Sequence, residues 1–371
     1  MTAKLCCVFN LAAHYRADIY RLIDRELDAD FYIGDAVANI KTMDYSLLKG
    51  YRATLANRNV IGSFYWQSGV LGLLHKSEYG TFLMTGEFFC LSTWLFLLIK
   101  ALFYRRKRIY FWTHGWYGHE GRTKRILKKM FFGMADGIFL YGNYAREEMV
   151  KNGFNGNKLF VIHNSLSYAR QLELRKNMKL ADIYREHFDN DRPTLIFIGR
   201  LTAVKRLDLL IDAVALFKSR NEIYNVVLVG DGVMRRQLEQ RAELKGIGHN
   251  VWFYGACYDE RTNAELIYNA DLCVAPGNVG LTAMHTMVFG CPVITHNDFK
   301  WQMPEFEAIH PGSTGDFFER DSVESLVDAI SRWIAANHSR RDAVRQACYL
   351  EIDTQWTPQF QISVIKKGLN I

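Results

Sequence analysis

The sequence has 371 residues, of which 49% are hydrophobic and 23% are charged. This balance excludes a disordered chain, and the length exceeds what one ordinary core needs, so we expect two domains. A formal net charge of +7 is distributed unevenly along the chain.

The cysteines and the first residues indicate a compartment. The seven cysteines are scattered, with no CxxC pair and no histidine at metal-ligand spacing. Several lie in apolar runs such as "DLCVAP" (271–276), which disfavours a disulfide framework or a zinc site and favours a reducing environment. The start, "MTAKLCCVFN", lacks the apolar region and cleavage site of a signal peptide, so we expect a cytoplasmic protein.

The first half alternates apolar, β-rich runs with helical patterns. A strand at 4–11, a helix at 12–27 and a second strand at 28–35 predict a parallel sheet with crossover connections. Further buried strands are expected at 108–115, 137–143 and 157–166.

Between these strands lies the longest apolar stretch, residues 88–104, which Lys100 interrupts. It is shorter than the ~20 residues that a membrane-spanning helix needs, so we expect a buried or membrane-facing helix. Ten basic side chains and one acid, Glu120, follow between residues 100 and 129. The basic residues are Lys100, Arg105, Arg106, Lys107, Arg108, Arg122, Lys124, Arg125, Lys128 and Lys129.

The segment "GRTKRILKKMFFGM" (121–134) adds apolar residues at helical spacing to this charge. A basic amphipathic helix next to an apolar one is typical of attachment to an anionic membrane surface. A solvated helix face, or one that holds a phosphate, is the alternative interpretation. Nucleic acid is disfavoured, because no aromatic recognition module accompanies the charge.

Residues 167–192 are polar and helical in character, and we place the domain boundary there. The expected domains are residues 1–170 and 190–354, with a last helix at 355–371 that packs back on the first; the family resemblance described below implies that the first is the acceptor-side domain and the second the nucleotide-sugar-binding domain. From 193 onward, strands and helices alternate in about five β/α units, which predicts a second doubly wound domain. We therefore expect an α/β fold of two Rossmann-like domains that face each other across a cleft, with ligands at the carboxyl ends of the strands.

The second domain opens with residues suited to a diphosphate. A strand at 194–198 ends in Gly199, followed by Arg200 and, five residues later, by Lys205 near the start of a helix. Two cations beside the free N–H groups of a helix N-terminus make an anion site, although surface residues that cap neighbouring elements would give the same pattern. Gly230 in "LVGDG" (228–232) is a weaker signal, and the missing GxGxxG pattern disfavours a dinucleotide redox site.

Several segments of the second half form an ordered series: "GRLTAVK", "VGDG", "FYGACYDERTNAELIYNADLCVAPG", "GLTAMHTMVFGCPVI", "MPEF" and "GSTGDFFE". Taken in order, they resemble the C-terminal domain of family 4 glycosyltransferases (glycosyltransferase group 1), which have the GT-B fold. The resemblance covers residues 194–335 well, and the first half only in architecture and at "THG" (113–115).

The resemblance implies a role for each matching residue. Arg200 and Lys205 would neutralise the diphosphate of a UDP- or GDP-linked sugar, and His114 would face the donor sugar, although a purely structural histidine stays an alternative. The donor-site residues implied in the same way are Gly199, Gly230, Tyr254, Gly255, Gly277, Asn278, Gly280, Leu281, His285 and Glu305.

The sequence departs from the family at the two glutamates that relatives carry in and after the glycine loop. His285 takes the place of the glutamate that contacts the ribose, and an imidazole can still hydrogen-bond a hydroxyl. The sugar-facing glutamate falls near Gly277, and Asn278 is the candidate replacement. Glu305 and Glu307 are more distant candidates, since Glu305 fits equally well as the first residue of a helix.

The resemblance also implies a retaining transferase in which the donor phosphate accepts the proton, so no dedicated base, no metal and no cofactor are expected. Positioning and electrostatic stabilisation of the leaving diphosphate would then carry catalysis. We expect transfer to a glycan or lipid-linked acceptor in capsule, exopolysaccharide or lipopolysaccharide synthesis, at the inner face of the plasma membrane through residues 100–129. The alternatives are a catalytically weak GT-B protein that binds a nucleotide sugar or a partner enzyme, and another GT-B enzyme such as an epimerase.

Overall fold

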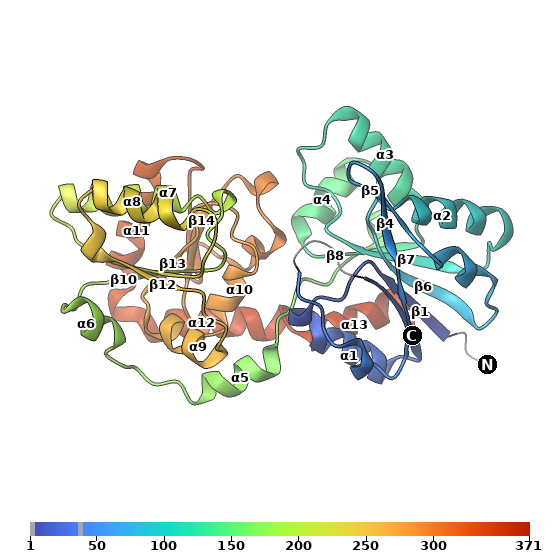
Figure 1. Ribbon diagram of the computed structural model, residues 1–371, viewed down its shortest axis with the longest axis horizontal. Coiled ribbons are helices and arrows are strands. Elements are labelled where there is room, and N and C mark those ends of the chain that lie inside the picture. The colour runs from blue at the N-terminus through green and yellow to red at the C-terminus, as the bar shows by residue number, and fades with distance from the viewer. Residues whose placement is uncertain (1–3, 36–39) are drawn as a thin grey trace. The chain divides into compact units, whose positions relative to one another are not determined.

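A computed structural model describes residues 4–35 and 40–371, and within it the chain divides into two units (Figure 1). The first unit comprises Met1–Ser167 and Thr357–Ile371, and the second comprises Tyr168–Trp356. The polar segment that the sequence leaves between the two domains forms helices α5 (Tyr168–Lys176) and α6 (Ile183–Phe188) of the second unit.

The first unit is built on a parallel sheet with the strand order β3-β2-β1-β6-β7-β8-β9. The chain adds β2 and β3 on one side of β1 and then continues on the other side with β6. The order therefore reverses between β1 and β6, and open α/β sheets bind ligands beyond the carboxyl ends of the strands at such a point. The strands are β1 Lys4–Phe9, β2 Ala29–Gly34, β3 Tyr51–Leu55, β6 Tyr79–Thr85, β7 Arg108–Thr113, β8 Gly137–Leu140 and β9 Leu159–Val161.

Apolar cores lie on both faces of this sheet, because side chains alternate along each strand. Leu5, Cys7 and Phe9 of β1 face one core, and Cys6 and Val8 face the other. Helices α1 (Ala17–Glu26) and α13 (Pro358–Leu369) cover the first core, and α2 (Leu91–Phe103), α3 (Arg122–Gly133) and α4 (Asn143–Lys151) cover the second (Figure 1).

The sequence did not indicate β3, β6 or the antiparallel hairpin of β4 (Asn57–Ile61) and β5 (Phe64–Gln67). β3 and β4 are largely exposed, so they lack the apolar run that marks the buried strands. The omission matters, because β5 and β6 contribute to the site described below.

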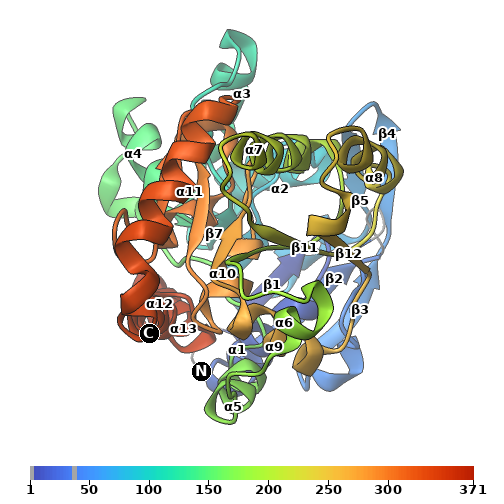
Figure 2. The ribbon, with the colours of Figure 1, turned by 90° about the vertical axis from the view of Figure 1, so that its left-hand side faces the viewer.

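The second unit has a parallel sheet with the order β12-β11-β10-β13-β14-β15, which reverses between β10 and β13. Its strands are β10 Thr194–Ile198, β11 Asn225–Val229, β12 Val251–Gly255, β13 Leu272–Val274, β14 Val293–His296 and β15 Gly315–Phe318. Figure 2 shows α7, α8 and α11 on one face of this sheet and α9, α10 and α12 on the other. These helices are α7 Leu207–Ser219, α8 Arg235–Leu244, α9 Glu260–Asn269, α10 Thr282–Met287, α11 Val323–Asn337 and α12 Arg341–Gln355.

The apolar stretch at 88–104 contains α2, which is partly buried. Phe96 and Leu97 are buried, whereas Leu98, Leu102 and Phe103 are exposed. In residues 4–35 and 40–371, none of the helices combines the length and the apolar character that crossing a membrane requires.

The basic region at 100–129 corrects one expectation, since two of its cations do not lie on a positive surface. Lys128 is only 4% exposed and pairs with Glu120, and Lys100 binds Asp136 at 2.9 Å. The exposed cations of this region are Arg105, Arg106, Arg108, Arg122, Lys124, Arg125 and Lys129.

Candidate active site

In the second unit, the loops that follow β10 and β13 meet where the strand order reverses. The backbone N–H groups of Gly277 and Asn278 donate to the carbonyl oxygens of Lys205 and Val204, at 3.0 and 3.1 Å. Lys205 Nζ in turn donates to the carbonyl oxygens of Asn278 (2.6 Å) and Val279 (3.3 Å). The predicted phosphate-binding lysine is thus built into the glycine loop.

Two of the predicted glycines are required by the approach of neighbouring backbone. A Cβ atom at Gly277 would lie 2.1 Å from the carbonyl oxygen of Val204, and one at Gly230 would lie 1.9 Å from that of Gly199. No side chain fits at these distances. Both glycines therefore hold adjacent loops together, whatever they offer to a ligand.

Two further predicted residues, Arg200 and Glu305, influence the pKa of Lys205. Burial lowers the pKa of Lys205 to about 8; the negative charge of Glu305 opposes this shift and the positive charge of Arg200 adds to it. Arg200 is exposed, whereas Glu305 is buried in the short 3-10 helix η8 (Pro304–Ala308). Lys205 is therefore bonded to the backbone of Asn278 and lies within electrostatic range of Arg200 and Glu305, so an anion bound near Lys205 would be attracted by both cations.

Gln302 was not among the predicted site residues, yet its side chain hydrogen-bonds the backbone of the glycine loop and holds that loop in place. Its Oε1 accepts from the Val279 N–H at 2.9 Å, and its Nε2 donates to Thr295 Oγ1 at 2.8 Å and to the Gly277 carbonyl oxygen at 3.3 Å. The side chain is 3% exposed. An isolated glutamine in "KWQMPEF" carries no signal by itself, because its partners become neighbours only through the fold.

Three of the predicted glycines, Gly199, Gly230 and Gly255, lie at the carboxyl ends of neighbouring strands. The Gly230 N–H donates to the Gly255 carbonyl oxygen at 2.8 Å, and the Gly199 N–H donates to the end of β11 at 2.9 Å. Tyr254 lies one residue earlier, half-buried, with its ring centroid 5.0 Å from that of Trp252. Burial raises the pKa of this tyrosine, so it stays neutral.

Leu281 precedes α10, and His285 lies within it, bound to a carboxylate that the sequence did not single out. His285 Nε2 lies 3.2 Å from Glu260 Oε1, and Gln171 Nε2 donates to the same oxygen at 2.8 Å. Burial opposes ionisation of Glu260, but the hydrogen bond and charge of His285, with the bond from Gln171, lower its pKa. The imidazole at this position is therefore held by an ionised carboxylate from α9.

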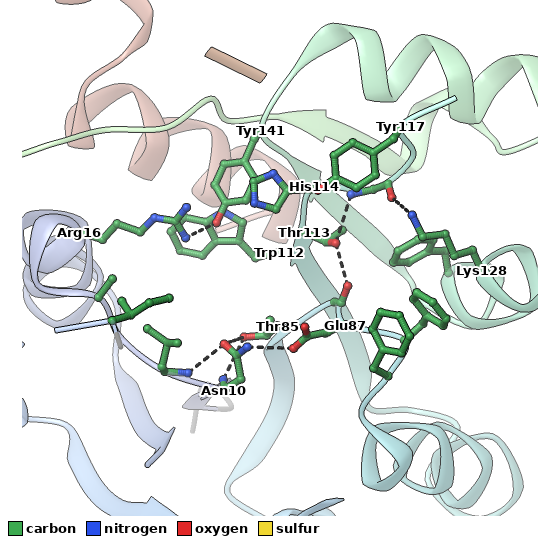
Figure 3. A pocket seen from close by; sticks show the side chains of 18 of the residues that line it. Asn10, Arg16, Thr85, Glu87, Trp112, Thr113, His114, Tyr117, Lys128 and Tyr141 are labelled. Carbon is green, nitrogen blue, oxygen red and sulfur yellow. Dashed lines mark hydrogen bonds between the residues drawn. The ribbon is translucent and has the colours of Figure 1, made fainter. Parts of the chain in front are cut away.

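The first unit has a cavity of about 340 Å³ that is lined by residues following β1, β6, β7 and β8 (Figure 3). The reversal of strand order between β1 and β6 lies within this group of strands. His114 lines the cavity, with its ring centroid 4.6 Å from that of Tyr141. Burial, and then the positive charges of Arg16 and Lys128, lower the pKa of His114 to about 3, so its imidazole is neutral.

The loop after β7, which carries His114, is held by a buried ion pair. Lys128 Nζ donates to Glu120 Oε1 and to the Gly115 carbonyl oxygen, both at 2.7 Å. The backbone N–H groups of Tyr117 and Gly118 donate to the two oxygens of Glu120 at 2.9 Å. Lys128 and Glu120, counted from the sequence as part of a surface charge pattern, thus shape one wall of the cavity.

Comparisons with known proteins agree with this architecture. Residues 179–348 match the family of glycosyl transferases group 1. The GDP-mannose-dependent alpha-(1-6)-phosphatidylinositol dimannoside mannosyltransferase of Mycobacterium tuberculosis is 28% identical over 156 residues, which are 41% of this chain and 39% of that protein. The chain covers 36–40% of the length of the curated relatives that it matches.

Solved structures are similar over almost the whole chain. The Anabaena protein HepE, crystallised with UDP, has a TM-score of 0.74 at 14% identity and covers 99% of this chain and 100% of its own. The lipopolysaccharide outer core galactosyltransferase WaaB has a TM-score of 0.73 at 13% identity, with 99% of each chain covered. The chain therefore has the two-domain α/β fold called GT-B, and its residues 179–348 are similar to the glycosyl transferases group 1.

Proposed function

We propose that this protein is a glycosyltransferase that moves a sugar from a nucleotide-diphosphate donor to a glycan or lipid-linked acceptor. The observation that carries the proposal is Lys205, which lies beneath the loop 277–280 and beside Arg200 where the second sheet reverses its order. The mycobacterial relative uses GDP-mannose and HepE binds UDP, which supports a GDP- or UDP-linked donor.

The chemistry that these residues offer is stabilisation of a leaving diphosphate. Arg200 and Lys205, with backbone N–H groups of the glycine loop, would meet the charge that develops on the β-phosphate as the bond to the sugar breaks. The donor phosphate itself can accept the proton of the attacking hydroxyl. We therefore propose retention of anomeric configuration, without a metal ion or a further cofactor.

Donor turnover tests this proposal. The full-length protein is incubated with UDP- and GDP-linked sugars, and release of the nucleoside diphosphate is measured with and without EDTA. We expect slow hydrolysis of one donor, unaffected by EDTA, and NMR of a transfer product should show the donor's anomeric configuration. Binding of nucleotide sugars without turnover, with any acceptor extract, would instead support a GT-B protein that only binds them.

We further propose that the enzyme acts in the synthesis of a surface polysaccharide such as capsule, exopolysaccharide or lipopolysaccharide, at the inner face of the plasma membrane. The support comes from α2 and α3, two helices that pack through Trp94 and Phe131 with ring centroids 5.1 Å apart. Exposed apolar residues occur on α2 (Leu98, Leu102 and Phe103) and on α3 (Ile126 and Met130), and α3 also carries the exposed cations Arg122, Arg125 and Lys129.

Apolar side chains flanked by cations suit an anionic membrane, where each basic residue contributes about 1 kcal/mol near the surface. Flotation with liposomes tests this, and we expect binding to rise with the fraction of anionic lipid. Ile126→Ser with Met130→Ser, and Arg125→Glu, should each reduce binding. Leu244→Ser, an 88% exposed leucine of the second unit, is the matched control, and indifference to lipid charge would contradict the proposal.

A further inference from the structure

The cavity of the first unit contains a carboxylate with one oxygen in use and one available. Asn10 Nδ2 and Tyr65 Oη donate to Glu87 Oε2 at 2.9 and 2.8 Å. Burial, followed by the nearby Cys90 and Glu87, raises the pKa of Tyr65, so this phenol stays a donor. Among the described residues, Glu87 Oε1 has no hydrogen-bond donor. The side chain is thus oriented by two neighbours, with its second oxygen ready to accept.

Across the cavity, His114 provides the complementary group. Its Nδ1 atom is buried and has no hydrogen-bond partner in the described part of the chain. A buried N–H without an acceptor costs more than an acceptor without a donor, so we assign the proton of this neutral imidazole to Nε2. Figure 3 shows Asn10, Thr85 and Glu87 on one side of the cavity, and Arg16, Tyr141 and His114 on the other.

Aromatic rings make up much of the remaining wall. Trp112 and Tyr141 lie with ring centroids 6.1 Å apart, and Phe88 and Phe89 lie at 4.0 Å. A volume of about 340 Å³ is near the lower end of the range of about 300–1,000 Å³ for small-molecule sites. Flat apolar walls with a few directed polar groups suit the C–H face and the hydroxyl edge of a sugar ring.

Three of the residues that line the cavity are cations, and they differ in their partners. The Arg16 guanidinium donates to the Tyr141 hydroxyl and lies 4.6 Å from the centroid of that ring. Lys128 pairs with Glu120, and Lys124 is exposed, 5.7 Å from the Phe88 centroid. A phosphate or carboxylate placed against Glu87 would be repelled by that carboxylate, so the group that contacts Glu87 is an uncharged donor such as a hydroxyl.

From these observations we infer that the cavity takes the acceptor as an uncharged, hydroxylated pyranose ring, and that Glu87 is the residue that selects it by accepting from a ring hydroxyl. The inference rests on the proposed transferase function and names the acceptor class for it. Glu87 acts here in specificity and positioning, and the proton of the reacting hydroxyl still passes to the donor phosphate.

Ligand-observed NMR on the full-length protein provides the test. The probes are methyl glycosides of neutral hexoses, the corresponding methyl uronosides, and hexose 6-phosphates. We expect saturation transfer to a neutral glycoside and little to the charged analogues. Glu87→Gln should weaken neutral binding about ten- to a hundredfold, because the charged acceptor is lost. It should also reduce the discrimination against uronosides.

Two controls separate this role from loss of the fold and from failure of the proposed function. Glu78→Gln changes an exposed glutamate at the other end of β6 and should leave glycoside binding unchanged. Nucleotide binding by the second unit, measured in parallel, should be unaffected by Glu87→Gln. In the transfer reaction the KM for the acceptor should rise, with kcat changed much less.

Equal or stronger binding of uronosides or sugar phosphates would overturn the inference, as would unchanged glycoside binding by Glu87→Gln. If no neutral glycoside binds while a nucleotide does, the inference fails and the proposed function stands. If glycosides bind and no nucleotide sugar does, the transferase function fails instead, and the cavity is a sugar site with another purpose.

Discussion

In the first unit, the sheet reverses its strand order between β1 and β6, and the residues that follow these strands include aromatic rings and the carboxylate of Glu87. In the second unit, the reversal lies between β10 and β13, and the residues that follow are glycines with Arg200 and Lys205. Two sheets of one kind thus present opposite chemistry at the same topological position. The fold provides the place for a ligand, and the loops decide whether hydroxyl groups or phosphates suit it.

The two units also differ in how they hold their loops. In the first unit a buried ion pair, Lys128 with Glu120, holds the loop after β7, whereas in the second unit the neutral side chain of Gln302 holds the glycine loop together with Lys205. Breaking a buried ion pair leaves an uncompensated charge, whereas removing a neutral partner leaves one unpaired polar group. The loops of the first unit should therefore be the more sensitive to a single substitution.

The largest expected effect is on stability, from Lys128→Ala. This change leaves the Glu120 carboxylate buried without its cation, which should lower the free energy of unfolding by about 3–5 kcal/mol. Urea denaturation measures the loss, and hydrogen exchange at Tyr117 and Gly118 assigns it to the first unit. Lys129→Ala, at an exposed neighbouring position, is the control. Equal stability of the two variants would show that the ion pair does not hold the loop.

The next effect is on ligand binding by the second unit. Arg200→Ala and Lys205→Ala should each weaken UDP or GDP binding by about 1.5–3 kcal/mol, because each removes a cation from the diphosphate. Isothermal titration calorimetry measures the affinity. Arg220→Ala, just beyond the far end of α7, should bind the nucleotide like the unchanged protein. If both variants keep full affinity, the diphosphate lies elsewhere and the contrast between the units fails.

The sequence predicted the second unit better than the first, for a physical reason. Strands such as β10, β11 and β13 are buried throughout, so each appears as a short apolar run. Edge strand β3 alternates between exposed and partly buried residues, β4 of the small hairpin is mostly exposed, and β5 has only the short aromatic run "FYW". Arg200 and Lys205 could be assigned to one candidate site from the sequence, because both lie in the loop that follows β10.

Residues that act across the fold could not be found in this way. Glu87 meets Asn10 and Tyr65, Glu260 meets His285, and Gln302 meets Val279, always over 20 or more positions of sequence. The prediction that Lys128 belongs to a basic surface was wrong for a related reason. The order of charges along residues 100–129 does not show which lysine is buried against Glu120.

A smaller effect is expected from Gln302→Leu, which keeps the volume but removes the acceptor of the Val279 N–H and the donor to the Gly277 carbonyl oxygen. Leaving these buried groups unpaired should cost about 1–3 kcal/mol of stability and loosen the glycine loop. Thermal unfolding and nucleotide affinity report the two consequences. Gln302→Glu retains an acceptor for Val279 but turns a carboxylate oxygen toward the Gly277 and His296 carbonyl oxygens, so it should lose at least as much affinity as the leucine variant; full affinity in both variants would contradict a positioning role.

The finest distinction between the units is in their response to pH. His114 stays neutral across the physiological range, whereas Lys205, with its pKa lowered to about 8, changes charge at the upper end of it. A bound diphosphate favours the charged ammonium and raises its pKa. Below pH 8 nucleotide affinity should therefore be constant, and above pH 8 it should fall toward tenfold per pH unit, about 1.4 kcal/mol.

Lys205→Arg separates this titration from all others. A guanidinium remains charged throughout the range, so its affinity for UDP or GDP should be flat from pH 7 to 9, even if it is weaker overall. The nucleotide's own phosphates are ionised well below pH 8 and contribute equally to both curves. Parallel curves for the two proteins would show that Lys205 does not lose its charge in this window. If nucleotide affinity falls above pH 8 in the unchanged protein alone, Lys205 is the group that binds the diphosphate. Glycoside binding in the first unit should stay independent of pH over the same range.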